Sequence, residues 1–399
     1  HAEPYIHNIS KAYEKSLLFG EHTWGLCVAS ALGRDRRYEK EAFLQDKNTP
    51  KYKRIEASWN EQRDRVHSAE TEVNKTLPCM MDSLAAHVSA DGPRLAALNG
   101  LGWSRNALIE LDSYKEQLEG MQLVDAATGE TVDTRIFNGS LQAYVKKMPA
   151  FGYKTLLLRK GIFQNHPDRD IICNANDGIL ENKYYRIKVN TADGTVQSLF
   201  EKTSGYEWVD STKHSGFGQY RYDIYGEEDY TEYIRSYAYR FSGWLLDDLG
   251  RLSYPPQDHL IFVPSNFSID EEIGKGYASF VMKALINDES IQKYGNAREI
   301  ETRINIYDDN PYIDFAFHLN GKEETPFLEA GHFIFPLNLK HPEIRINKLG
   351  SVVNPAIDIV KDANTEMYCC ENWVDFSDGE KGMAFVAYDA PLFSIGDQA

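Results

Sequence analysis

The sequence has little basic charge and no long apolar run, and each shortage excludes a class of function. Its 43 Lys and Arg residues stand against 60 Asp and Glu residues, which gives a net charge of −17 over 399 residues. Nucleic acids and anionic membranes both bind basic surfaces, so this balance disfavours them. No stretch of about 18 apolar residues occurs. We therefore expect no nucleic acid and no membrane among the partners.

Cysteine is also scarce, and its spacing carries no motif. The five cysteines are odd in number and include no Cys-x-x-Cys pair: Cys27, Cys79, Cys173, Cys369 and Cys370. A disulfide framework or a thiolate zinc site would need paired, regular spacing. We interpret these residues as buried or incidental thiols.

The two ends of the sequence are abrupt. It begins at His1 without an initiator Met or a signal-peptide pattern, and it stops at Ala399 just after an apolar run. We expect a piece of a longer protein that is truncated at its C-terminus. Composition carries no signal for an oligomeric state or a compartment.

Residues 1–92 are predicted to form a helical domain. From Tyr52 onward the apolar residues recur every three or four positions, which is the spacing of one helix face. Pro78 is predicted to kink or break this long helix near residues 74–77. Two or three such helices form an antiparallel bundle.

The helical period then gives way to short runs of β-forming residues separated by turn signals. Residues 94–162 are predicted to form a small β-sandwich module, and residues 163–177 read as a polar linker. Residues 175–399 contain many alternating runs with no helices between them, which is typical of a large antiparallel sandwich. The predicted fold class is therefore α+β and multidomain. We interpret the acidic run at residues 226–233 as a solvated or cation-contacting loop.

One candidate metal ligand lies near the N-terminus, at His22 within Phe19-Gly-Glu-His-Thr-Trp-Gly25. A neutral imidazole at a chain reversal is a good zinc ligand, and Glu21 or Thr23 could orient it. A packing histidine beside a core Trp is the plainer interpretation, because no second His stands at metal-ligand spacing nearby.

Two further candidates are sugar contacts. Asn372 and Trp373 combine an amide and an aromatic ring near the expected end of a strand. Aromatic faces suit the C–H surfaces of sugars and amides suit their hydroxyls, although packing is the plainer role for Trp373.

Five short sequence motifs, which occur here in the same order as in the family, resemble glycoside hydrolase family 38, the α-mannosidases. Asn99 to Arg105 is similar to the family phrase Asn-Pro-Leu-Ser-Trp-x-Arg, with Gly100 in place of Pro. The other four phrases lie at residues 148–153, 180–187, 194–199 and 329–336. The resemblance extends over about residues 5 to 399.

The resemblance implies the middle and C-terminal part of a retaining, zinc-dependent hydrolase of α-mannosides or related glycans. It implies that residues 175–399 form a β-supersandwich of the galactose mutarotase type. It also implies an N-terminal catalytic α/β domain that this sequence lacks, together with most zinc ligands and the nucleophile. His22 is the nearest match to the family's remaining metal His, although Glu21-His22-Thr23-Trp24 stands where the family has His-His-Asp-Ala. No catalytic residue is assigned, and we expect the chain alone to be inactive.

Two other classes of function remain open. A non-catalytic carbohydrate-binding or scaffold protein would bind sugar without hydrolysis and without sensitivity to a chelator. A lyase or epimerase using the same supersandwich would need its own acid/base pair within residues 175–399.

Overall fold

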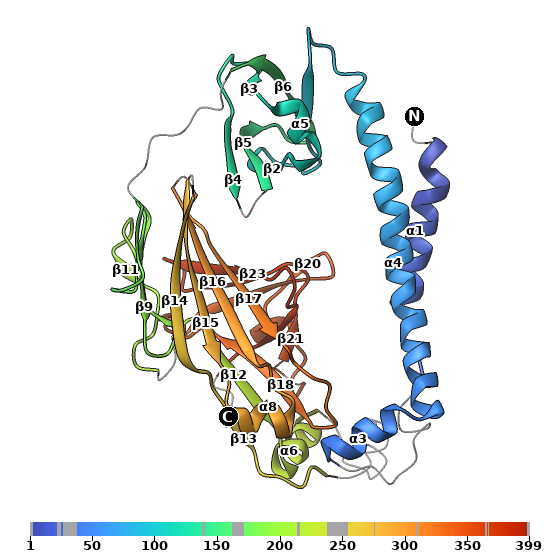
Figure 1. Ribbon diagram of the computed structural model, residues 1–399, viewed down its shortest axis with the longest axis vertical. Coiled ribbons are helices and arrows are strands. Elements are labelled where there is room, and N and C mark those ends of the chain that lie inside the picture. Colours follow the sequence, from blue (N-terminus) through green and yellow to red (C-terminus); the bar gives the residue numbers. More distant parts are fainter. Residues whose placement is uncertain are drawn as a thin grey trace.

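The computed structural model describes residues 3–21, 25–26, 38–137, 140–161, 171–213, 216–237, 254–274, 276–308, 310–363, 365 and 367–396. A long helical arm stands along one side, a small β module lies at one end, and the remaining strands form a large β region (Figure 1). Among these residues, no helix is both long and apolar enough to cross a bilayer.

The helical arm is a hairpin of two antiparallel helices with a short helix at its base. Its elements are η1 (Glu3–Tyr5), α1 (Ile6–Phe19), α3 (Lys40–Lys47) and α4 (Pro50–Ala85). Thr49 caps α4 because its side chain accepts a hydrogen bond from the Tyr52 backbone N–H. None of the side chains of α1 is buried, and only four of α4 are. The described residues thus show a two-helix hairpin with α3, and the full bundle stays a prediction.

Helix α4 continues through Pro78 to Ala85, so the helix does not break there, and a kink at this proline stays a prediction. Proline removes one backbone hydrogen bond from the helix. Helix α1 packs beside this turn. Asn8 Nδ2 donates to Thr76 Oγ1 at 3.1 Å, and the Tyr5 hydroxyl donates to the Cys79 carbonyl at 3.3 Å.

The small β module consists of two three-stranded antiparallel sheets that share one apolar core. One sheet has the order β1 (Arg94–Asn99), β6 (Gly152–Lys160), β3 (Met121–Asp125), and the other has β2 (Arg105–Glu110), β5 (Ser140–Met148), β4 (Asp133–Phe137). Two short helical turns, η2 (Asp112–Tyr114) and α5 (Lys115–Leu118), follow β2. Leu118, Leu123, Ala143 and Leu156 are wholly or almost wholly buried in the shared core.

The large β region begins with two sheets that pack face to face. The first has the order β11 (Tyr206–Glu207), β10 (Thr195–Glu201), β9 (Tyr185–Asn190), β8 (Ile179–Glu181), β7 (Ile172–Asn174). The second has the order β14 (Ser265–Gly274), β15 (Tyr277–Leu285), β16 (Glu299–Tyr307), β17 (Ile313–Asn320). Residues from both sheets, including Leu180, Ile187, Phe280 and Ile304, form one core.

Three further sheets complete this region. They are β13 (Leu260–Phe262), β12 (Gln219–Ile224), β18 (Glu329–Ile334); then β20 (Ser351–Val353), β19 (Glu343–Lys348), β22 (Trp373–Ser377), β23 (Gly382–Val386); then β21 (Met367–Cys369) with β24 (Leu392–Ser394). The helices of the region are α6 (Glu227–Tyr237), α8 (Asp288–Tyr294) and α9 (Pro355–Asp358). Every strand pair described is antiparallel, as an α+β fold class predicts. The supersandwich stays an expectation.

Candidate functional site

Strand β12 presents an apolar face to the core and a charged face on its other side. Tyr220, Tyr222 and Ile224 are buried. Because side chains alternate along a strand, Arg221 and Asp223 point the opposite way. Arg221 lies directly across from His332 on β18. The charged face therefore collects side chains from two neighbouring strands.

Asp223 is the centre of this face and is 0% exposed. Arg221 Nε donates to Asp223 Oδ2 at 2.9 Å, and His259 Nε2 lies 2.8 Å from Asp223 Oδ1. A buried carboxylate without such donors would be strongly destabilising. We call Arg221, Asp223, Tyr225, Asp229, His259 and His332 the Asp223 cluster.

His259 joins two carboxylates through its two ring nitrogens. Its Nδ1 lies 3.1 Å from Asp229 Oδ1, while its Nε2 faces Asp223. Only the doubly protonated ring donates to both carboxylates. Asp229 Oδ2 also accepts a hydrogen bond from the Gly226 backbone N–H at 2.7 Å. The imidazole therefore ties the first turn of α6 to strand β12.

Residues 227–233 of the acidic run belong to α6, so the predicted loop is wrong. Glu227, Glu228 and Asp229 fill the first turn of the helix. Acidic residues are favourable there because unpaired backbone N–H groups carry partial positive charge. Asp229 Oδ1 lies 3.1 Å from His259 Nδ1, and contact of this run with a cationic group stays a prediction.

His332 is the cluster's second imidazole. Its Nε2 lies 3.1 Å from the Tyr225 hydroxyl and 3.5 Å from Asp223 Oδ2. Burial holds the pKa of His332 below its ordinary value, the charges of Arg221 and His259 act in the same direction, and Asp223 opposes them. Burial also raises the pKa of Tyr225 to about 12. The Tyr225 hydroxyl and His332 Nε2 are thus within hydrogen-bonding distance, and the tautomer of the ring decides which of them donates.

This arrangement can hold and orient a neutral imidazole. His332 is 23% exposed at its side chain, so a small ligand can reach it. Asp223 is enclosed and paired, and it cannot approach an external reacting carbon. The chemistry that the cluster offers is therefore hydrogen bonding to a polar ligand by His332, with Asp223 as the fixed countercharge.

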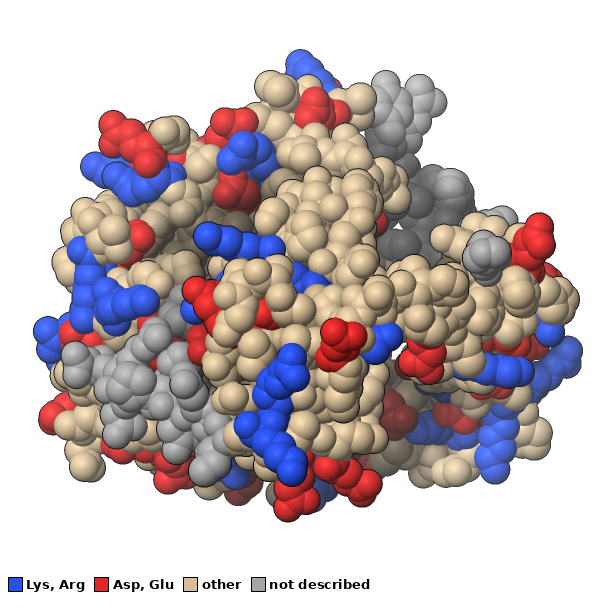
Figure 2. All heavy atoms as spheres, turned by 90° about the horizontal axis from the view of Figure 1, so that it is seen from above, with Lys and Arg blue, Asp and Glu red and all other residues tan. Residues whose placement is uncertain are grey.

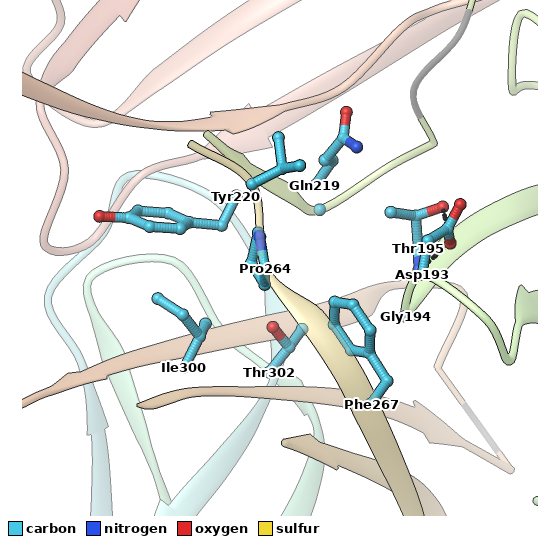
Figure 3. Close-up of a pocket in the computed structure, with 11 residues that line it drawn as sticks. Asp193, Gly194, Thr195, Gln219, Tyr220, Pro264, Phe267, Ile300 and Thr302 are labelled. Carbon is cyan, nitrogen blue, oxygen red and sulfur yellow. Dashed lines mark hydrogen bonds between the residues drawn. The ribbon is translucent and has the colours of Figure 1, made fainter. Parts of the chain in front are cut away.

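A small cavity lies at the start of β12, between that strand and the turn before β10 (Figure 3). Its volume is about 70 Å³. Ligand sites commonly measure about 300–1,000 Å³, so this space suits one or two waters. Thr195 Oγ1 donates to Asp193 Oδ1 at 2.8 Å within the lining. The cavity is too small for a sugar ring.

The surface charge is mixed on the face seen in Figure 2. Acidic and basic side chains alternate there with wide uncharged areas. The excess of acidic residues is therefore not gathered on this face into a single negative field.

The family model described as the C-terminal domain of glycosyl hydrolases family 38 matches residues 180–389. The chain belongs to glycosyl hydrolase family 38. The matched residues include all six members of the Asp223 cluster. The cluster is thus part of the family 38 domain itself.

Two solved structures share the fold of this family 38 chain. The crystal structure of an alpha-mannosidase from Enterococcus faecalis V583 has a TM-score of 0.56 at 13% identity and covers 84% of this chain. A protein in glycosyl hydrolase family 38 from Enterococcus faecalis has a TM-score of 0.52 at 13% identity and covers 83%. The chain spans only 42% and 43% of these two proteins. No curated protein matches the sequence.

The predicted site residues of the family 38 chain lie away from the Asp223 cluster or outside the described residues. His22 is outside them. Asn372 is exposed, and its Nδ2 donates to Asn347 Oδ1 at 3.0 Å. Trp373 is half-buried at the start of β22, opposite Val386. Sugar contact by these two residues stays a prediction.

Sequence reasoning did not single out Asp223, His259 or His332. The alternation of tyrosines with Arg221 and Asp223 was a usable signal, because it marks a strand with one charged face. The arrival of His259 from 36 positions away had no local signal.

Proposed function

We propose that this chain is the middle and C-terminal region of a retaining, zinc-dependent glycoside hydrolase acting on α-mannosides or related glycans. The match of residues 180–389 to the family 38 domain carries the proposal. The shared fold with a bacterial alpha-mannosidase supports it. Because the chain spans less than half of that protein, the proposal concerns a larger catalytic unit.

Zinc has no fitting site among the residues described. No group of three or more His, Cys, Asp or Glu residues within the described ranges could hold a metal ion. In the Asp223 cluster, His259 already faces a carboxylate with each ring nitrogen. We therefore derive no step through zinc. His22 is proposed as one ligand of a zinc site that other residues complete.

The chain alone is proposed to be inactive. Retaining hydrolysis needs two carboxyl groups about 5–5.5 Å apart, one of them free to attack the sugar. The two carboxylates of the cluster, Asp223 and Asp229, face opposite sides of the His259 ring, and Asp223 is enclosed. In this proposal the cluster positions His332 as a hydrogen-bonding group for a sugar hydroxyl.

A turnover assay tests the inactivity. The chain is incubated with an aryl α-mannoside with and without added zinc, beside a family 38 α-mannosidase as positive control. We expect no release of the aryl group by the chain under either condition. Release that rises with chain concentration would contradict the proposal.

Nuclear magnetic resonance tests the role of His332. We expect the His332 ring signals to shift when methyl α-mannoside is added, while those of the exposed His318 stay in place. His332→Gln should remove the response. Equal shifts at both histidines, or none at either, would contradict a sugar contact at the cluster.

A further inference from the structure

Two of the family-like phrases meet in space at one end of the small β module. Asn99 closes strand β1 and pairs with Gly152 at the start of β6. Just beyond this pair, the Phe151 backbone N–H donates to the Leu101 carbonyl at 2.8 Å. The loop at residues 100–104 and the loop at residues 149–151 therefore lie side by side.

One buried amide holds both loops. Asn99 is only 5% exposed. Its Nδ2 donates to the carbonyls of Trp103 at 2.9 Å and Pro149 at 2.8 Å, and its Oδ1 accepts from the Leu101 N–H at 3.2 Å. Because the buried side chain has three backbone partners across two loops, the geometry of this end is fixed before any ligand arrives.

This rigid end carries large aromatic side chains that face water. Trp103 is 62% exposed and Phe151 is 79% exposed, and Tyr153 beside them is also exposed. The Phe151 ring lies over Gly102, where a Cβ atom would come within 3.2 Å of the ring. Packing inside the module does not explain these rings, because folding favours their burial.

The backbone at this end is strained in a way that keeps a ring outside. Phe151 has φ of +44°, in the left-handed region that non-glycine residues rarely adopt. Glycine or asparagine would occupy that conformation more easily. Strained residues of this kind persist mainly at functional sites. An exposed, strained phenylalanine therefore points to a contact with a ligand.

A guanidinium group accompanies the rings. Arg105 is exposed and stands two residues after Trp103. Its main chain pairs with Met148, so it belongs to the same end of the module. Aromatic faces cover the C–H surface of a pyranose ring, and a guanidinium donates to hydroxyl oxygens. These are the two chemical needs of a sugar.

We propose that four residues, Trp103, Arg105, Phe151 and Tyr153, form a glycan-binding site, and we call these residues the Trp103 tip. The ligand is a polymer of neutral hexoses, whose successive rings stack on Trp103 and Phe151. The site lies outside residues 180–389 and needs no catalytic step.

Affinity electrophoresis of the full chain in gels containing soluble α-mannan tests the proposal. We expect retardation by the polymer, and about three- to tenfold weaker binding in Trp103→Ala, consistent with the loss of one aromatic contact. Phe151→Ala should weaken binding similarly, and Trp103→Phe should restore part of it. Tyr388→Ala removes an aromatic side chain that is 88% exposed in the other β region, and it should bind like the parent.

The outcomes separate the alternatives. No retardation in α-mannan or in a β-glucan gel would overturn the proposal, as would equal retardation of Trp103→Ala and Tyr388→Ala. Retardation only in a sulfated polymer, lost in Arg105→Gln, would overturn the neutral hexose ligand. Circular dichroism and thermal melting confirm that each variant is folded. Because binding is measured without turnover, its result is independent of whether the parent enzyme is a hydrolase.

Discussion

The helical arm and the large β region use their side chains very differently. Helix α4 has 36 residues and only four buried side chains, whereas β15 has nine residues and six buried ones. Leu17, Leu77 and Leu84 on the arm are exposed. Helix stability in proteins comes mainly from tertiary packing of an apolar face. The β region therefore carries its own stability, and the arm has apolar surface left over.

Truncating a large apolar side chain should reveal the largest difference in unfolding free energy between the large β region and the helical arm. Phe280→Ala in β15 should cost about 3–5 kcal/mol of unfolding free energy, because it leaves a cavity in the main core. Leu77→Ala on the arm should stay within about 0.5 kcal/mol. Urea unfolding followed through the buried Trp208 measures both. A comparable loss from Leu77→Ala would show that the arm is more tightly packed than its exposure indicates.

The charged face of β12 should be the next most sensitive place. Asp223→Asn keeps the shape but removes the countercharge of Arg221 and His259, so we expect a loss of about 2–3 kcal/mol. Glu110→Gln, an exposed change of the same kind in the small module, serves as control and should be within about 0.5 kcal/mol. If Asp223→Asn and Glu110→Gln were equally stable in thermal unfolding, the Asp223 cluster would not stabilise the fold, and the prediction would be wrong.

A gain in stability is expected at the Trp103 tip. Phe151→Asn should raise unfolding free energy by up to about 1 kcal/mol, because asparagine tolerates the left-handed region. The same change at Phe200, an exposed position in strand β10, should destabilise. Calorimetry measures the unfolding free energy of both variants. A loss at Phe151 would mean that its ring stabilises the fold more than its backbone strains it.

The smallest effect concerns pH. The pKa of His332 in the fold is lowered from a value of about 6.5 in an unfolded chain. A depressed pKa means that the neutral ring favours folding, so its contribution is complete above about pH 6.5 and is lost as pH falls. His332→Gln should flatten this part of the stability–pH curve, and His318→Gln should not. Parallel curves for the parent and His332→Gln would contradict a buried neutral imidazole.

Much of the architecture could be predicted from periodicity, whereas the polar cluster could not. Spacing of three and four marked the helices, and alternation marked strands such as β9 and β16. Asp223 meets His259 and His332 only through the register of β12 with β18 and the return of the chain to β13. Register is a tertiary property, and no local pattern contains it.

The two corrected predictions share one physical cause. The acidic run before Tyr230 was expected in a loop because charges favour water, yet they suit the first turn of α6. Pro78 was expected to kink or break α4, yet the helix continues through it, next to hydrogen bonds from α1. In both places a neighbour or a helix end outweighed the intrinsic preference of the residue. The family phrases at Asn99 and Phe151 were found in the sequence, but their contact was visible only in the fold.

Strand β12 shows how little freedom such a two-faced element has. Its tyrosines line the core while Arg221 and Asp223 serve the cluster, and both faces depend on pairing Arg221 with His332. Inserting or deleting one residue would turn the whole strand over, moving the charges into the core and the tyrosines toward the polar side. Length changes should therefore be eliminated from this strand during evolution far more strictly than substitutions, and related chains should keep its residue count even where their identities differ.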